Sequence, residues 1–196
     1  VRLVQQRVVD RPIFLMGHSV GAVVVLDYLL RSPETTVQGA IAFSPALGEM
    51  GVSPLKVLLG KVLSRLVPRF SLHTSIDPGT ASRDPAVVAA NLQDSLRHDL
   101  VSARLATEFF ATVEWVHAHA DRWNIPLLLL HGGADQVALP AGSRCFFKRV
   151  GLVDKEYREY PGAYHELQDD LNYPEVMSDL EEWLERHLPS KMLHLL

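Results

Sequence analysis

A serine between two glycines is the residue of this chain best suited to nucleophilic chemistry. Ser19 lies in the segment 17–21, Gly-His-Ser-Val-Gly, which matches the G-x-S-x-G pattern of a nucleophile elbow. The apolar run 13–16 before it has the composition of a buried strand, and the pattern from 22 to 30 is helical. We expect both glycines to be needed, because an elbow brings the backbones of strand and helix close together.

Serine is a poor nucleophile near neutral pH, so it needs a base that removes its proton. Asp135 and His165 each follow a predicted strand, and the order Ser, Asp, His is the order of α/β-hydrolases. A neutral histidine can accept the proton, and a carboxylate can fix its tautomer. We therefore predict that Ser19, Asp135 and His165 are catalytic, with the backbone N–H of Val20 in the oxyanion hole.

We expect the other titratable residues near these positions to have structural and not catalytic roles. His18 is too close to Ser19 along the chain to act as its base, so we expect it to pack. His131 is expected to support the loop of Asp135, and Glu166 to be a helix-start or surface carboxylate. The remaining histidines show no metal-ligand spacing, so we predict neither a metal nor a cofactor: His73, His98, His117, His119, His187 and His194.

Four strand-like runs alternate with helical patterns and would position these residues. Strands are predicted at 13–16, 38–43, 126–130 and 155–160, with helices at 22–30, 141–150 and 175–188. This alternation predicts an α/β fold with a parallel sheet, whose carboxyl ends carry the site. The segment from about 48 to 124 shows no convincing strand, so we expect an all-helical cap there.

The predicted cap contains three helices. One covers about 55–66, a second begins with Asp84 as N-cap and Pro85 at the first position, and a third runs over 102–122. The first carries an apolar stripe: Leu55, Leu58, Leu59, Val62, Leu63 and Leu66. Basic residues mark its other side: Lys56, Lys61, Arg65 and Arg69. The stripe could line an acyl route, meet a membrane surface or face a core.

Composition limits the function classes. The chain has 196 residues, 47% of them hydrophobic and 21% charged, which suits one globular domain. A net charge of −4 without a long basic run argues against a nucleic-acid partner. Cys145 is the only cysteine, the first residues given do not resemble a signal peptide, and no uninterrupted apolar run is long enough to span a bilayer. These features favour a soluble cytoplasmic protein, with peripheral membrane contact through the cap as an option; they leave its oligomeric state open.

Several segments together resemble the monoacylglycerol lipases of the α/β-hydrolase superfamily. They are the elbow at 17–21, Ser-Pro-Ala-Leu at 44–47, the helical cap, the run from Pro126 to Asp135, and Tyr-Pro-Gly-Ala-Tyr-His at 160–165. The resemblance implies hydrolysis of a monoacylglycerol to a fatty acid and glycerol through an acyl-enzyme on Ser19, beneath the cap.

The resemblance also implies that residues 1–196 form a partial α/β-hydrolase domain, with the cap at about 48–124. Relatives carry further amino-terminal strands and a His-Gly loop that supplies a second oxyanion-hole donor, for which this chain shows no candidate. Without those strands, we expect the strand at 13–16 to lie at the edge of the sheet.

Two alternatives remain open at this point. The first is a related enzyme, a lysophospholipase or a general esterase, because apolar cap residues suit an acyl chain without identifying its head group. The second is an α/β-hydrolase-like binding module that has lost activity because its oxyanion hole is incomplete.

Overall fold

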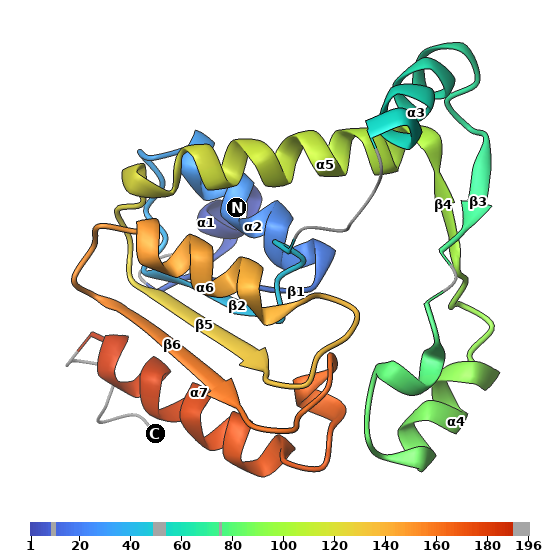
Figure 1. Ribbon diagram of the computed structural model, residues 1–196. Helices are drawn as coiled ribbons and strands as arrows, with labels where there is room; N and C mark the ends of the chain where they lie inside the picture. Colours follow the sequence, from blue (N-terminus) through green and yellow to red (C-terminus); the bar gives the residue numbers. More distant parts are fainter. Residues whose placement is uncertain (9–10, 49–53, 75, 190–196) are drawn as a thin grey trace.

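The computed structural model describes residues 1–8, 11–48, 54–74 and 76–189, without the side chains of 54–59 (Figure 1). Its helices and strands alternate along most of the chain, with three short 3₁₀ turns. In order they are α1 (Arg2–Arg7), β1 (Phe14–His18), α2 (Val20–Arg31), β2 (Gly39–Phe43), α3 (Pro54–Leu66), β3 (Ser71–His73), η1 (Pro78–Thr80), α4 (Pro85–Gln93), β4 (Leu100–Ser102), α5 (Ala103–Ala118), η2 (Ala120–Arg122), β5 (Leu127–Gly132), α6 (Pro140–Arg149), β6 (Lys155–Tyr160), η3 (Leu167–Asp169) and α7 (Tyr173–His187).

The main sheet contains the four predicted strands in the order β1-β2-β5-β6, and all neighbouring strands are parallel. The strand predictions are therefore confirmed, with ends shifted by at most two residues. As expected, β1 lies at one edge of this sheet, and the side chain of its Met16 is 61% exposed. Because all four strands are parallel, their carboxyl ends lie along the same end of the sheet, and the candidate site lies there.

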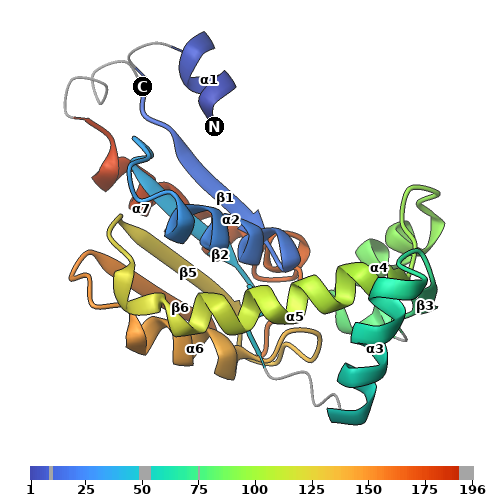
Figure 2. The same cartoon turned by 90° about the horizontal axis from the view of Figure 1, so that it is seen from above.

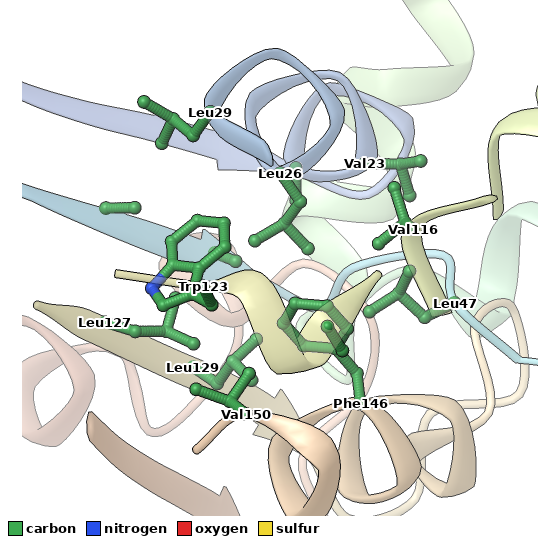
Figure 3. Close-up of a cluster of buried hydrophobic side chains, with 14 of the residues drawn as sticks. Val23, Leu26, Leu29, Leu47, Val116, Trp123, Leu127, Leu129, Phe146 and Val150 are labelled. Carbon is green, nitrogen blue, oxygen red and sulfur yellow. The ribbon is translucent and has the colours of Figure 1, made fainter. Parts of the chain in front are cut away.

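Side chains of the two central strands alternate between two apolar layers. Ala40 and Leu129 face the layer formed with α2, α5 and α6, which Figure 3 shows converging around Leu26 and Phe146. Ile41 and Leu130 face the other layer, which α7 covers with Val176 and Trp183. Figures 1 and 2 show these helices on opposite faces of the sheet. Burying one leucine in such a layer contributes about 1.5–3 kcal/mol, so both layers hold the sheet in place.

The segment between β2 and β5 contains helices α3, α4 and α5, but the all-helical prediction was wrong. Strands β3 and β4 form a separate antiparallel pair, with Ser71 opposite Ser102 and Leu72 opposite Val101. Each strand has only three residues and is largely exposed, so neither produces a periodic apolar pattern. Their pairing joins residues about thirty positions apart, which local sequence patterns do not indicate.

Helix α3 does not place its apolar stripe on one buried face. Ser64 is buried and Leu63 is partly buried, whereas Val62 and Leu66 are 45% and 76% exposed. The core-facing interpretation is therefore wrong for Val62 and Leu66. Helix α3 packs against α5, but a Cβ atom at Gly60 would have nothing within 4 Å, so this glycine is not needed for the packing. Leu55, Leu58, Leu59 and Lys56 lie outside the described side chains.

Candidate active site

Ser19 occupies a strained turn between β1 and α2. Its backbone has φ 54° and ψ −119°, a conformation that costs a residue with a side chain about 1–3 kcal/mol and that proteins retain mainly at functional sites. The backbone N–H of Ser19 donates to the carbonyl of Phe43 at 2.9 Å, which ties the turn to the end of β2. The Ser19 side chain makes no capping hydrogen bond to α2, so its hydroxyl is available for other chemistry.

The two glycines of the motif have different roles. A Cβ atom at Gly17 would lie 2.5 Å from the carbonyl oxygen of Gly21, so the close approach of strand and helix requires glycine there. A Cβ atom at Gly21 would have nothing within 4 Å. The prediction that both positions need glycine is thus wrong for Gly21, because that residue points away from the crossing.

Asp135 and His165, 30 residues apart in the chain, are in direct contact. The Nδ1 atom of His165 donates to Oδ2 of Asp135 at 2.7 Å, and both side chains are nearly or fully buried. Gly132 permits this approach, because a Cβ atom there would lie 2.1 Å from the carbonyl oxygen of Tyr164. A carboxylate can only accept, so the proton of neutral His165 is on Nδ1. Its Nε2 lone pair is therefore left free to act as a base.

The loop of Asp135 satisfies every acceptor site of its carboxylate. Oδ1 accepts from the backbone N–H groups of Val137 (2.8 Å) and Ala138 (2.9 Å). The Nε2 atom of His131 lies 3.2 Å from Oδ2 and 2.7 Å from the Ala138 carbonyl. Both partners are acceptors, so His131 Nε2 carries the proton, and its Nδ1 accepts from the Ser143 hydroxyl at 2.8 Å. The prediction that His131 supports this loop is confirmed.

Electrostatics keep this carboxylate ionised. Burial alone would raise the pKa of Asp135, but hydrogen bonds from His131 and His165 outweigh it and hold that pKa far below its usual range. A permanently charged Asp135 stabilises the imidazolium that forms when His165 accepts a proton. The pair therefore has the orientation and charge that a general base requires.

His18 packs against His165, as predicted, and also bonds to it. The two rings are 4.8 Å apart between centroids, and His18 Nε2 donates to the backbone carbonyl of His165 at 3.2 Å. Burial, followed by the neighbouring His165, lowers the pKa of His18. A neutral His18 adds no positive charge that would oppose protonation of His165.

The same edge of the sheet holds the remaining predicted residues. Ser19 follows β1, and Val20 is the first residue of α2, where a backbone N–H has no acceptor within the helix. Ser19 and His165 are both described, and their side chains make no hydrogen bond to each other. Catalytic hydrogen bonds are commonly long before substrate binds, so the roles of Ser19 and Val20 stay predictions.

Glu166 is not a surface carboxylate. It is 7% exposed and caps the 3₁₀ turn η3 without a side-chain bond to it. Its Oε1 accepts from Arg97 Nη1 and its Oε2 from Asn91 Nδ2, both at 3.0 Å. No local pattern indicates these contacts, because Asn91 and Arg97 lie 75 and 69 residues earlier in the chain.

Comparison with known proteins shows the family of this chain. A family model described as serine aminopeptidase, S33, matches residues 1–172. The chain belongs to this family. S33 proteins have the α/β-hydrolase fold, so the fold class that the sequence predicts is confirmed.

Three proteins that are similar to this chain have names that concern lipids. A monoacylglycerol lipase of Mycolicibacterium smegmatis is 32% identical over 90% of this chain and 63% of its own length. The phospholipase YtpA of Bacillus subtilis is 27% identical over 93% of the chain and 71% of its own. The crystal structure of a monoacylglycerol lipase of Paleococcus ferrophilus matches with a TM-score of 0.87 and 36% sequence identity. The match covers 95% of this chain and 72% of the lipase chain. The chain thus spans slightly less than two thirds of the mycobacterial lipase.

Proposed function

We propose that this S33 protein hydrolyses carboxylic esters through Ser19, His165 and Asp135. The observation that carries the proposal is the buried hydrogen bond from His165 Nδ1 to Asp135 Oδ2, at the same sheet edge as the strained Ser19 turn. This bond leaves His165 Nε2 free as the base, while the turn presents a serine between β1 and α2. Neither feature is needed for a binding module, so both favour the enzyme.

The reaction proceeds in two steps. The Ser19 oxygen attacks the ester carbonyl carbon while His165 Nε2 accepts the hydroxyl proton, and the Val20 N–H stabilises the oxyanion. The bond to the leaving alcohol oxygen breaks, and His165 returns the proton to that oxygen. Water then attacks the acyl-Ser19 ester with His165 again as base, which releases the carboxylic acid and restores the serine.

We infer that the substrate is a monoacylglycerol. The relatives named as monoacylglycerol lipases support this class, and the cap supplies an apolar cavity of about 470 Å³. Its lining comes from α3, the β3–β4 pair and α5, and includes Leu63, Phe70, Leu72, Val101 and Phe110. Its size and apolar lining suit an acyl chain, the first of the roles that the α3 stripe suggested, and its lining residues do not include Ser19, Asp135 or His165.

A lysophospholipase is the second candidate function. The similarity to the phospholipase YtpA favours it, and the cap cavity suits either substrate because both contain one acyl chain. The two differ in the head group that leaves, glycerol or a glycerophosphodiester.

A substrate comparison tests the proposal. The protein and its Ser19→Ala variant would be incubated with monooleoylglycerol, lysophosphatidylcholine and p-nitrophenyl butyrate, and fatty acid or nitrophenol release would be measured. We expect release from monooleoylglycerol and the nitrophenyl ester by the wild type only. Faster release from lysophosphatidylcholine would favour the second candidate function. Equal rates for wild type and Ser19→Ala would contradict both enzymatic assignments.

A further inference from the structure

The backbone around His165 is held at three successive residues. The N–H of Tyr164 donates to Asp170 Oδ2 (2.7 Å), the carbonyl of His165 accepts from His18, and the N–H of Glu166 donates to the carbonyl of Ala81 (2.8 Å). We call residues 163–172 the histidine loop. Asp170 lies within this loop, whereas His18 and Ala81 hold it from two other parts of the chain.

One of these partners belongs to a segment of the cap, residues 81–97, which we call the cap arm. It includes α4 and connects to β3 and β4. Figure 1 shows α4 beside the loop that leads into α7, well away from the sheet. The cap arm is therefore the part of the cap that reaches the histidine loop.

Arg83 and Asp170 make the first side-chain connection between cap arm and histidine loop. The buried Asp170 accepts from Arg83 Nε at 3.0–3.1 Å and from the Arg83 backbone N–H at 2.9 Å. Arg83 Nη2 also donates to Asn172 Oδ1 at 2.8 Å. Because the same Asp170 carboxylate holds the Tyr164 N–H, Arg83 is connected through one residue to the segment that carries His165.

Glu166 makes the second connection, directly after His165 in the chain. Arg97 and Asn91 each donate to one oxygen of its carboxylate, and the Glu166 side chain is 10% exposed against 49% for Arg97. Burial raises the pKa of Glu166, but the bonds from Arg97 and Asn91 outweigh it and lower that pKa. The carboxylate thus remains charged wherever the enzyme would work.

The residues at and just before Asp135 also contact the histidine loop. The N–H of Ala134 donates to the carbonyl of Ala163 at 3.0 Å, and Gly132 packs against the Tyr164 carbonyl. His165 therefore lies between a rigid loop on the sheet and the cap arm. A shift of the cap arm would move His165 relative to Asp135 and Ser19.

We propose that the cap arm is a positioning element for the base His165, acting through Arg97–Glu166 and Arg83–Asp170. This inference rests on the proposed function, because it assigns His165 as the base. Cap and chemistry are then coupled: the cap encloses the acyl chain and also holds the imidazole in its reactive place. Displacements of about 1 Å in a catalytic group can cost about 10²-fold in rate.

The test uses Arg97, whose half-exposed side chain can be removed without opening the core. Arg97→Ala, Glu166→Ala and the double variant would be assayed for kcat and KM with p-nitrophenyl butyrate. We expect kcat to fall about 10-fold to 10²-fold with KM within about two-fold. The double variant should lose no more than Glu166→Ala alone, because Glu166→Ala already removes the Arg97 contact together with the Asn91 contact.

Two further variants separate positioning from general damage to the cap. Arg97→Lys keeps the charge and one donor, and the contact is a single hydrogen bond, so kcat should return to within about three-fold of wild type. Arg104→Ala removes an exposed cap ion pair with Glu108 and should leave kcat and KM unchanged. If Glu166→Ala fails to fold, Arg97→Ala and Arg97→Lys still decide the question.

The possible outcomes distinguish this inference from the proposed function. A fall in kcat that Arg97→Lys restores supports the positioning role. A rise in KM with kcat unchanged, or wild-type kinetics in Arg97→Ala, overturns it while the ester hydrolysis stands. A folded wild type that neither hydrolyses the ester nor reacts with a fluorophosphonate refutes the proposed function, and this inference with it.

Discussion

At the scale of single residues, Asp135 determines what His165 can do. Its four acceptor positions are filled by two backbone N–H groups and two histidine rings, so it cannot rotate away without leaving buried donors unpaired. Each bond also stabilises the ionised carboxylate, which is why the pKa of Asp135 is depressed despite its burial. The carboxylate thus fixes both the tautomer and the orientation of the base.

Asp135→Asn should lower kcat by about 10⁴ if the serine-protease triad is a fair guide. An amide has one acceptor and one donor group, so it favours the wrong tautomer of His165 while preserving the shape of the loop. Ester hydrolysis by the purified variant measures the effect. The matched control is Asp27→Asn, which removes a surface pair with Arg31 and should change nothing. Near-wild-type activity in Asp135→Asn would contradict the role of this carboxylate.

Glu166 allows a prediction about stability and pH. Its pKa is lowered in the folded protein from an ordinary value of 4.5, so the folded state binds the proton less readily than the unfolded state. The contribution of this carboxylate to the free energy of unfolding is complete above pH 4.5 and is lost as pH falls through the lower folded value. We expect it to be about 1 kcal/mol, because Arg97 is half exposed.

Urea unfolding of wild type and Glu166→Gln across pH 3–8 checks this prediction. The difference in free energy of unfolding should be constant above about pH 5 and shrink at lower pH. A difference that grows as the pH falls would mean that the folded protein prefers protonated Glu166, contrary to its contacts with Arg97 and Asn91.

At the scale of elements, the parallel sheet could be predicted mainly because β1, β2 and β5 each contain an apolar run, whereas β6 consists of charged residues and two tyrosines. Leu127 to Leu130 is buried on both faces and has no other plausible place in a fold. Strands β3 and β4 could not be predicted, since three exposed residues carry no periodic signal. The faces of α3 were misassigned because an apolar stripe does not show which side of a helix is covered: Ser64 is buried, whereas Val62 and Leu66 are exposed.

The crossing of β1 and α2 provides a prediction with an internal control. Gly17→Ala should destabilise the protein and abolish activity, because its Cβ would overlap the backbone of Gly21 and Ala22. Gly21→Ala has open space and should be neutral or stabilising by up to about 1 kcal/mol, since alanine is the better helix former. Thermal unfolding of both variants measures this. Equal destabilisation by both would contradict the described geometry of the elbow.

At the scale of the whole molecule, helix α5 connects the two halves of the structure. Its carboxyl end packs in the sheet core through Val116, while its amino end forms the cap with α3 and β4 (Figures 1 and 2). The contacts between the cap arm and the histidine loop form a second connection between the cap and the sheet. None of these could be predicted from the sequence: Arg83 and Asp170 are 87 positions apart and carry no local signal. In contrast, the sequence was enough to predict Ser19, Asp135 and His165 as candidates, because their order along the chain is a readable signal.

The outer side of α3 leads us to propose a contact between cap and lipid. No helix in the described part of the chain is long and apolar enough to cross a membrane. Val62, Leu66 and Val67 are nonetheless exposed beside Lys61 and Arg65. We expect the protein to float with phosphatidylglycerol vesicles more than with phosphatidylcholine vesicles, and Val62→Asp with Leu66→Asp to abolish flotation.

The control is Leu96→Asp, which removes an even more exposed apolar residue from the cap arm and should leave flotation unchanged. Negligible flotation of the wild type with both vesicle types would exclude the lipid contact and leave the acyl cavity as the main role of the cap.

Covalent labelling of the folded protein tests the central claim most directly. A fluorophosphonate reacts with a serine only where a base activates it, and mass spectrometry of the digested product identifies the residue. We predict one adduct, on Ser19, that is absent in Ser19→Ala and strongly reduced in His165→Ala. An adduct on another serine, or labelling that persists in His165→Ala at the wild-type rate, would contradict the assignment of Ser19 and His165 as nucleophile and base.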